Sequence, residues 1–157
     1  MKVEAATPAD VRRVAEQMRS RDREEFMAVS PFKTHDELVD AIVARYGDHQ
    51  DVIVAHWENG PVAVGGLIHH RPHVGTLMFF ANDDLEKIGS DLTRFIKQRL
   101  FPGYTLAGTH RIECASLDGY EEVHRWLGVL GLVKEATMQK YGRNGEDFVQ
   151  FSWTRDD

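Results

Sequence analysis

The sequence predicts an α/β domain in which a mixed, mostly antiparallel sheet of about seven strands is flanked by helices. Short apolar runs typical of strands alternate along the chain with segments whose apolar residues recur at helical spacing. Two Asn-Gly pairs, Asn59-Gly60 and Asn144-Gly145, lie between such runs and mark β-hairpins. The length of 157 residues suits one domain with a substantial core, so we expect a single domain over residues 1–157.

The first third of the chain is expected to hold one strand and two helices. Thr7 caps the first helix, with Pro8 in its first turn and Asp10 at the capping-box position. A second helix begins at Thr34 and ends near Gly47. Between them the chain is charged and ends in Ser-Pro, which favours a loop. The elements expected here are strand 2–6, helix 7–18, loop 19–33 and helix 34–47.

The rest of the chain is expected to hold most of the sheet. Its longest helix follows the third strand of this part and carries one apolar face, formed by Leu85, Ile88, Leu92, Ile96 and Leu100. The expected elements are hairpin 51–72, strand 74–82, the helix that follows it, strand 111–116, helix 120–131 and hairpin 133–154. The whole order is therefore β-α-α-β-β-β-α-β-α-β-β.

Composition narrows the function classes. A hydrophobic content of 42% and a charged content of 28% are ordinary for a soluble protein. No apolar run is long enough to span a bilayer, and the first residues lack the apolar core of a signal peptide, so we expect no membrane partner and a cytoplasmic location. The single cysteine, Cys114, fits a reducing compartment. The net charge of −6 argues against nucleic acid as a partner.

The stretch FFANDDLEKIGSDLTRF, residues 79–95, is expected to run from a strand through a short turn into a helix. This arrangement commonly binds a phosphate at the helix N-terminus. The turn nevertheless has almost no glycine and carries Asp83, Asp84 and Glu86, which would repel a phosphate. The alternative interpretation is structural: Asp83 or Asp84 caps the helix and Glu86 complements its dipole.

Three segments resemble the GNAT superfamily, the acyl-CoA-dependent N-acyltransferases: VEAATPADVRRVAE, IVAHWENGPVAVGGLI and HRWLGVLGLVKE. The order of elements fits the same fold over essentially the whole chain. Within this superfamily, residues 79–100, 125–135 and 143–154 are similar to the GNAT-like internal virion or morphogenesis proteins of T7-like bacteriophages. That narrower resemblance implies a bacterial host cell or a virion as the location, and phage structural proteins as partners.

The resemblance implies acetyl-CoA as cofactor, bound in the gap between strands 74–81 and 111–116. The fourth strand would contact the pantetheine arm through the backbone of Phe80 and Ala81, and the following turn would contact the pyrophosphate. Of the family pattern R/Q-x-x-G-x-G/A, only Gly89 and Ser90 have counterparts here, which indicates a degraded loop. The full expected cofactor set is Phe80, Ala81, Asn82, Gly89, Ser90 and Arg94; Lys87, Lys97 and Arg99 extend its basic face.

Acetyl transfer needs a base for the amine and an acid for the departing thiolate. The family's usual acid, a tyrosine in the late helix, falls at Leu127 in this chain. His124 is then the candidate acid and Tyr120 a second, poorer one, although both are also compatible with ordinary helix positions. Glu113 is the candidate base. His69 and His73 are further candidates, from a His-His-Arg-Pro-His run that lacks the spacing of a metal site.

Two functions from different classes follow from these observations. One is an acetyl-CoA N-acetyltransferase acting on a small amine or a protein amine. The other is a GNAT-fold protein that has lost catalysis and serves in a phage particle or its assembly. Cys114 is expected to be a buried apolar residue rather than a nucleophile.

Overall fold

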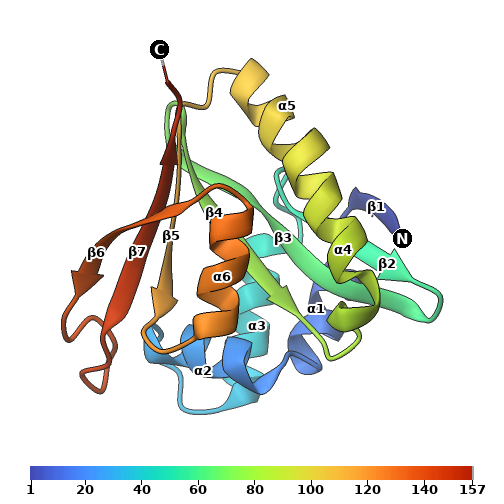
Figure 1. Cartoon of the computed structure of the whole chain (residues 1–157). Helices are drawn as coiled ribbons and strands as arrows, with labels where there is room; N and C mark the ends of the chain where they lie inside the picture. Colours follow the sequence, from blue (N-terminus) through green and yellow to red (C-terminus); the bar gives the residue numbers. More distant parts are fainter. Residues whose placement is uncertain (157) are drawn as a thin grey trace. The chain divides into compact units, whose positions relative to one another are not determined.

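Seven strands form one mixed sheet within residues 1–156, the part of the chain that the computed structural model describes. The strand order is β1-β2-β3-β4-β5-β7-β6. The elements, drawn in Figure 1, are β1 (Lys2–Ala5), α1 (Pro8–Glu16), α2 (Ser20–Ala28), α3 (His35–Tyr46), β2 (Ile53–Trp57), β3 (Gly60–Arg71), β4 (Val74–Ala81), α4 (Leu85–Phe95), a π-helical turn (Ile96–Leu100), α5 (Phe101–Leu106), β5 (Arg111–Leu117), α6 (Glu121–Val129), β6 (Val133–Met138) and β7 (Phe148–Thr154). This architecture confirms the predicted fold class.

Antiparallel pairs predominate in the sheet. β1 with β2, β2 with β3, β5 with β7 and β6 with β7 are all antiparallel. β4 and β5 are parallel, and their ladder joins Val74–Thr76 to Arg111–Glu113. None of the helices in the described part of the chain has the length and apolar character needed to cross a membrane.

The chain forms two compact units. The first unit contains Met1–Leu67 and Met78–Leu92, and the second contains Ile68–Leu77 and the chain from Thr93 onward. Helices α1 to α3 belong to the first unit, and α5 and α6 belong to the second.

The caps of the first unit are as the sequence predicts. The Thr7 hydroxyl accepts a hydrogen bond from the Asp10 N–H at 3.2 Å, and the Asp10 carboxylate accepts one from the Thr7 N–H at 3.1 Å. The Thr34 side chain caps α3 by accepting from the Glu37 N–H. Both helices contribute apolar side chains to the core: Val11, Val14, Leu38, Val39 and Ile42.

The expectation of a loop over residues 19–33 is wrong, because Ser20–Ala28 form helix α2. The segment lacks a strong apolar stripe, so its periodicity does not reveal a helix. Tertiary contacts hold it instead. Asp22 is buried, and the ring of Phe26 meets the ring of Phe80 edge-on, with centroids 5.7 Å apart. The helix therefore depends on the end of β4, which is far away in the sequence.

In the second unit, helix α6 covers one face of β5 and β7. Successive strand residues point to opposite faces, and Ile112, Cys114 and Ser116 are the buried set on β5. The rings of His124 in α6 and Phe151 in β7 lie 4.9 Å apart, which places α6 on this face. The expectation that Cys114 is buried is confirmed.

The helix after β4 continues beyond α4 through a π-turn into α5 (Figure 1). Pro102 explains the interruption. Proline has no N–H to donate to the carbonyl four residues earlier, and its ring clashes with that carbonyl. A π-turn over Ile96–Leu100, which ends two residues before Pro102, lets the helix continue without that hydrogen bond.

Candidate active site

The turn between β4 and α4, in the first unit, is organised by Asn82. Its side-chain oxygen accepts from the Asp84 N–H at 3.0 Å, and its amide nitrogen donates to the Pro61 carbonyl at 3.1 Å. Its backbone N–H donates to the Val62 carbonyl, and its carbonyl accepts from the Leu85 N–H. Asn82 is 8% exposed. The Asn82 side chain thus caps this turn at the Asp84 N–H, and a cap from the Asp83 or Asp84 side chain stays a prediction.

The acidic residues of the turn are near the surface. Asp83 is exposed, and Asp84 forms an ion pair with Lys87 at 3.3 Å. The Lys87 ammonium also lies 4.7 Å from the centre of the Trp57 ring, so this cation is already engaged with two groups. A pyrophosphate here would meet three carboxylates, counting Glu86, and a lysine directed elsewhere.

Gly89 lies within α4, one turn after its first residue. A Cβ built on it would meet no atom within 4 Å, so the local packing does not require glycine. Ser90 and Arg94 are exposed on the same helix. Arg94 belongs to the second unit, whereas Phe80, Ala81, Asn82, Gly89 and Ser90 belong to the first.

The backbone of Ala81, the last residue of β4, is occupied on one side by the start of α2. The Ala81 N–H donates to the Asp22 carboxylate at 3.0 Å, and the Ala81 carbonyl accepts from the Arg19 N–H at 2.9 Å. The Arg19 guanidinium in turn binds both oxygens of Asp22, at 3.0 and 2.8 Å. Ala81 was predicted as a cofactor contact, and both of its backbone groups already have partners within the chain.

Glu113, the predicted base, lies in the second unit between two arginines. One of its oxygens accepts from Arg111 Nε at 2.6 Å, and the other is 3.5 Å from Arg71 Nη2. Arg111 also forms a two-point contact with Glu135, at 2.9 and 3.0 Å. Both Glu113 oxygens are thus engaged by guanidinium groups, which leaves this carboxylate poorly placed to accept a proton from an amine.

The same cluster shifts two pKa values. Hydrogen bonds from Arg111 and from the Ser152 hydroxyl lower the pKa of Glu135 to about 2. Hydrogen bonds to Glu135 and Glu113 raise the pKa of Arg111 above its ordinary value. Each ion therefore stabilises the charged form of its partner. The cluster is a structural clamp that joins β5 to the edge strand β6.

His124 and Tyr120, the predicted acids, lie at the start of α6. His124 Nε2 is 3.1 Å from the Leu117 carbonyl. A carbonyl only accepts, so Nε2 carries the proton in this contact and uses it there. Tyr120 occupies the N-cap position, although its side chain does not cap the helix. Leu127, where the resemblance expects a tyrosine, is a core residue with 3% exposure.

The structure separates the predicted base from the predicted acid. On β5, Glu113 pairs with Ser152 and Cys114 pairs with Phe151. Directly opposed residues share a face, and neighbours along a strand do not. His124 packs on Phe151 and therefore lies on the face opposite Glu113. Glu113 and His124 can act in one reaction only if the substrate lies at an edge of β5. Groups on both faces of the strand can reach a substrate there.

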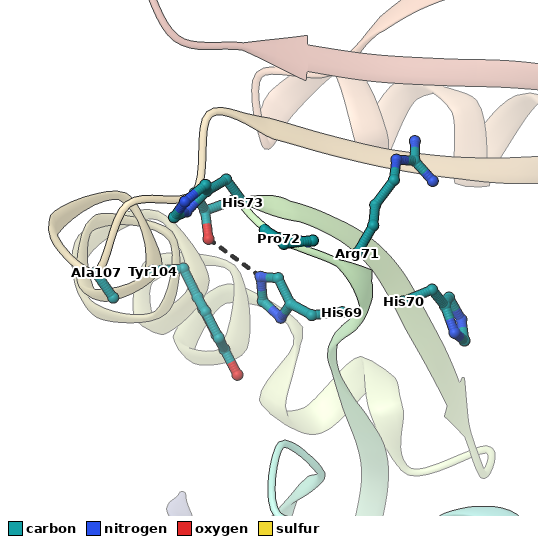
Figure 2. Close-up of a pocket in the computed structure, with 8 residues that line it drawn as sticks. His69, His70, Arg71, Pro72, His73, Tyr104 and Ala107 are labelled. Carbon is teal, nitrogen blue, oxygen red and sulfur yellow. Dashed lines mark hydrogen bonds between the residues drawn. The ribbon is translucent and has the colours of Figure 1, made fainter.

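A pocket of about 480 Å³ opens in the second unit beside the β3–β4 turn (Figure 2). His69 Nε2 is 3.1 Å from the Thr109 hydroxyl, and its ring lies 5.4 Å from that of Tyr104. Figure 2 shows His70 pointing away from this group, as expected for adjacent strand residues. No group of three or more potential metal ligands occurs among residues 1–156. The sequence indicated His69 and His73 but gave no sign of Tyr104 or Thr109, which tertiary folding brings there.

Comparison with known proteins identifies the class of fold. No protein family and no curated protein matches the chain by sequence. Among solved structures, ribosomal-protein-alanine N-acetyltransferase from Brucella melitensis matches with a TM-score of 0.72 at 15% identity, covering 99% of this chain and 100% of that one. At these identities the likeness shows the fold, which is that of the GNAT acetyltransferases.

Two further structures give the same result. The protein yncA from Salmonella typhimurium, provisionally assigned as an acetyltransferase and solved with its cofactor acetyl-CoA, has a TM-score of 0.71 at 15% identity, covering 99% of this chain and 94% of that one. A variant of spermidine N-acetyltransferase from Vibrio cholerae has a TM-score of 0.70 at 15% identity, covering 98% and 95%.

Proposed function

We propose that the protein is an acetyl-CoA-dependent N-acetyltransferase that acts on a small amine or a protein amine. The observation that carries the proposal is the match of the whole chain, 99% of its length, to an acetyltransferase fold. The named neighbours act on amines of both kinds, a ribosomal-protein alanine and spermidine. Fold alone does not determine activity, so the proposal also depends on the chemistry of the candidate site residues.

The proposed cofactor site is the end of β4 with the first turns of α4. The backbone of Phe80 and Ala81 would bind the pantetheine arm, and the α4 N-terminus would face the pyrophosphate. In the second unit, His124 would protonate the leaving thiolate as an imidazolium, through Nδ1, because Nε2–H is held by the Leu117 carbonyl. Glu113 would accept the amine proton only after exchanging Arg71 or Arg111 for the substrate.

The test is release of free thiol from acetyl-CoA with a panel of amines that includes polyamines and peptides with free N-termini. We expect release with at least one acceptor, and a loss of about 10²–10⁴-fold for His124→Ala. Leu127→Tyr should raise the rate if the remaining site is whole. An active native chain in which His124→Ala changes nothing would remove His124 from the mechanism and leave the enzyme intact.

A second candidate function is favoured by specific observations. The N–H groups of Asp84 and Leu85 are used inside the turn and that of Asn82 donates to β3, Glu113 is held by arginines, and Leu127 is buried. These features suit a GNAT fold without catalysis. The proposed role in a phage particle or its assembly rests on the segment resemblance alone. If the folded protein releases no thiol with any amine of the panel, this second, non-catalytic function is favoured.

A further inference from the structure

We propose that the start of α2 is an internal lid on the cofactor site, and that it must leave the end of β4 before an acyl-CoA can bind there. We call Arg19, Asp22 and Phe26 the α2 clasp. The inference rests on the proposed function, because it concerns how that cofactor reaches its site. All of the residues involved belong to the first unit.

The direction of the backbone supports the inference. Successive strand residues point their N–H and C=O groups to opposite edges. The Asn82 N–H is directed to β3, where it donates to Val62, so the Ala81 groups are directed to the other edge of β4. The N–H and C=O of one residue lie side by side on the edge of a strand. An extended amide ligand pairs with such a donor and acceptor.

The α2 clasp already occupies the N–H and the carbonyl of Ala81. The Asp22 carboxylate takes the Ala81 N–H and the Arg19 N–H takes the Ala81 carbonyl, so the clasp makes the two bonds that a secondary amide would make. The pantetheine arm of acetyl-CoA contains two secondary amides and is peptide-like in shape. One N–H and one carbonyl cannot serve both partners in this way, so the clasp and the arm exclude one another at Ala81.

The clasp is built to hold its position. Asp22 is 7% exposed, and both of its oxygens are bound by the Arg19 guanidinium, a strong charge-assisted contact. Phe26 adds its ring contact with Phe80 one helical turn further along. If only a small fraction of molecules has the clasp open, the apparent affinity for acetyl-CoA is reduced by that fraction.

The experiment is calorimetric titration of acetyl-CoA into the full chain and three variants. Asp22→Ala removes the clasp's carboxylate, and Asp22→Asn keeps an oxygen for the Ala81 N–H while losing the charge. Asp40→Asn is the matched control, because Asp40 also pairs with an arginine, Arg12 at 3.1 Å, on the surface of the same unit. We expect Asp22→Ala to bind about tenfold more tightly than the native chain. Asp22→Asn should be intermediate, and Asp40→Asn should match the native chain.

Amide hydrogen exchange gives a readout that does not depend on activity. In Asp22→Ala the Ala81 amide should exchange about tenfold faster or more, since its acceptor is gone, and acetyl-CoA should restore its protection. The Asn82 amide, bonded to Val62, should not change and reports that the strand remains folded.

Two contrary outcomes are distinct. If the native chain and Asp22→Ala bind acetyl-CoA with equal affinity, the proposal of a lid is contradicted and the proposed function stands. If neither binds, although Asp22→Ala is folded and its Ala81 amide exchanges freely, the cofactor assignment fails and the role of the lid fails with it.

Discussion

Asn82, Glu113 and His124, three polar side chains at candidate positions, all have partners within the chain. Asn82 caps the β4–α4 turn, Glu113 meets two arginines, and His124 donates to the Leu117 carbonyl. A side chain held in this way contributes to the fold whether or not it also contributes to a reaction. Substitutions at these positions therefore need a stability measurement beside every activity measurement.

His124→Ala should destabilise the fold by about 1 kcal/mol, because it removes a hydrogen bond to a carbonyl and a ring contact with Phe151. His124→Gln is the matched control, because its amide can still donate. Chemical denaturation of the three proteins checks this. Equal stability for all three would mean that the histidine is only a surface residue, as its helical position suggested.

The Glu135 contact with Arg111 predicts a pH dependence. The folded-state pKa of Glu135 is about 2, below its ordinary value of 4.5. A carboxyl whose pKa is depressed by folding stabilises the protein above the unfolded pKa and loses that effect as pH falls towards the folded pKa. The native chain should thus have a larger free energy of unfolding than Glu135→Gln. This difference should have its full size above pH 4.5 and should vanish as the pH approaches about 2.

The control for this measurement is Glu58→Gln, an exposed carboxyl in the turn that precedes β3. This variant also removes one carboxylate, so it corrects for the change in net charge. A difference for Glu135→Gln that grows as the pH falls would contradict the assignment, because it would require a raised pKa in the folded state.

Two residues with unusual backbone properties, Gly89 and Pro102, lie in α4 and its continuation. Pro102 accounts for the π-turn before it, because its ring cannot donate to the preceding turn. Gly89, by contrast, has no structural need visible in its surroundings, since a Cβ there meets open space. A glycine inside a helix is unfavourable relative to alanine. The local packing therefore gives no structural reason for a glycine at this position.

Gly89→Ala should stabilise the protein by about 0.5–1 kcal/mol, the ordinary gain for this change inside a helix. Gly66→Ala is the contrasting variant, because a Cβ at that position would lie 2.1 Å from the Asp51 carbonyl oxygen and force the backbone to move. Thermal unfolding distinguishes the two. Stabilisation by Gly89→Ala together with a loss of acetyl-CoA binding would show that phosphates approach this glycine.

At the scale of the whole molecule, charge opposes binding of a polyanion such as acetyl-CoA. The chain carries a net charge of −6, and three of its carboxylates, Asp83, Asp84 and Glu86, lie at the proposed pyrophosphate position. We expect the dissociation constant to be in the high-micromolar range or weaker. It should fall as ionic strength rises, because salt screens the repulsion between exposed charges.

Asp83→Gly and Asp84→Gly test this expectation together. The double variant should bind acetyl-CoA more tightly, provided the helix is still capped by Asn82. Calorimetry at two salt concentrations is sufficient. Nanomolar affinity of the native chain, or an affinity that weakens steeply with salt, would show that the basic side chains of α4 dominate the site.

The sequence alone determined the class of fold and most element boundaries. Strand and helix periods, the Thr7 capping box and the Asn-Gly turns are local signals, and each depends on residues only a few positions apart. The same local signals placed the turn between β4 and α4 and its acidic side chains.

Only the tertiary structure decided what occupies the candidate site. Helix α2 has no apolar stripe of its own and forms against the end of β4, so the contact of Asp22 with Ala81 joins residues 59 positions apart. The two arginines around Glu113 come from β3 and β5, and the partition of Glu113 and His124 onto opposite faces follows from the β5–β7 register. Such contacts depend on sheet order and helix packing, which no window of a few residues encodes.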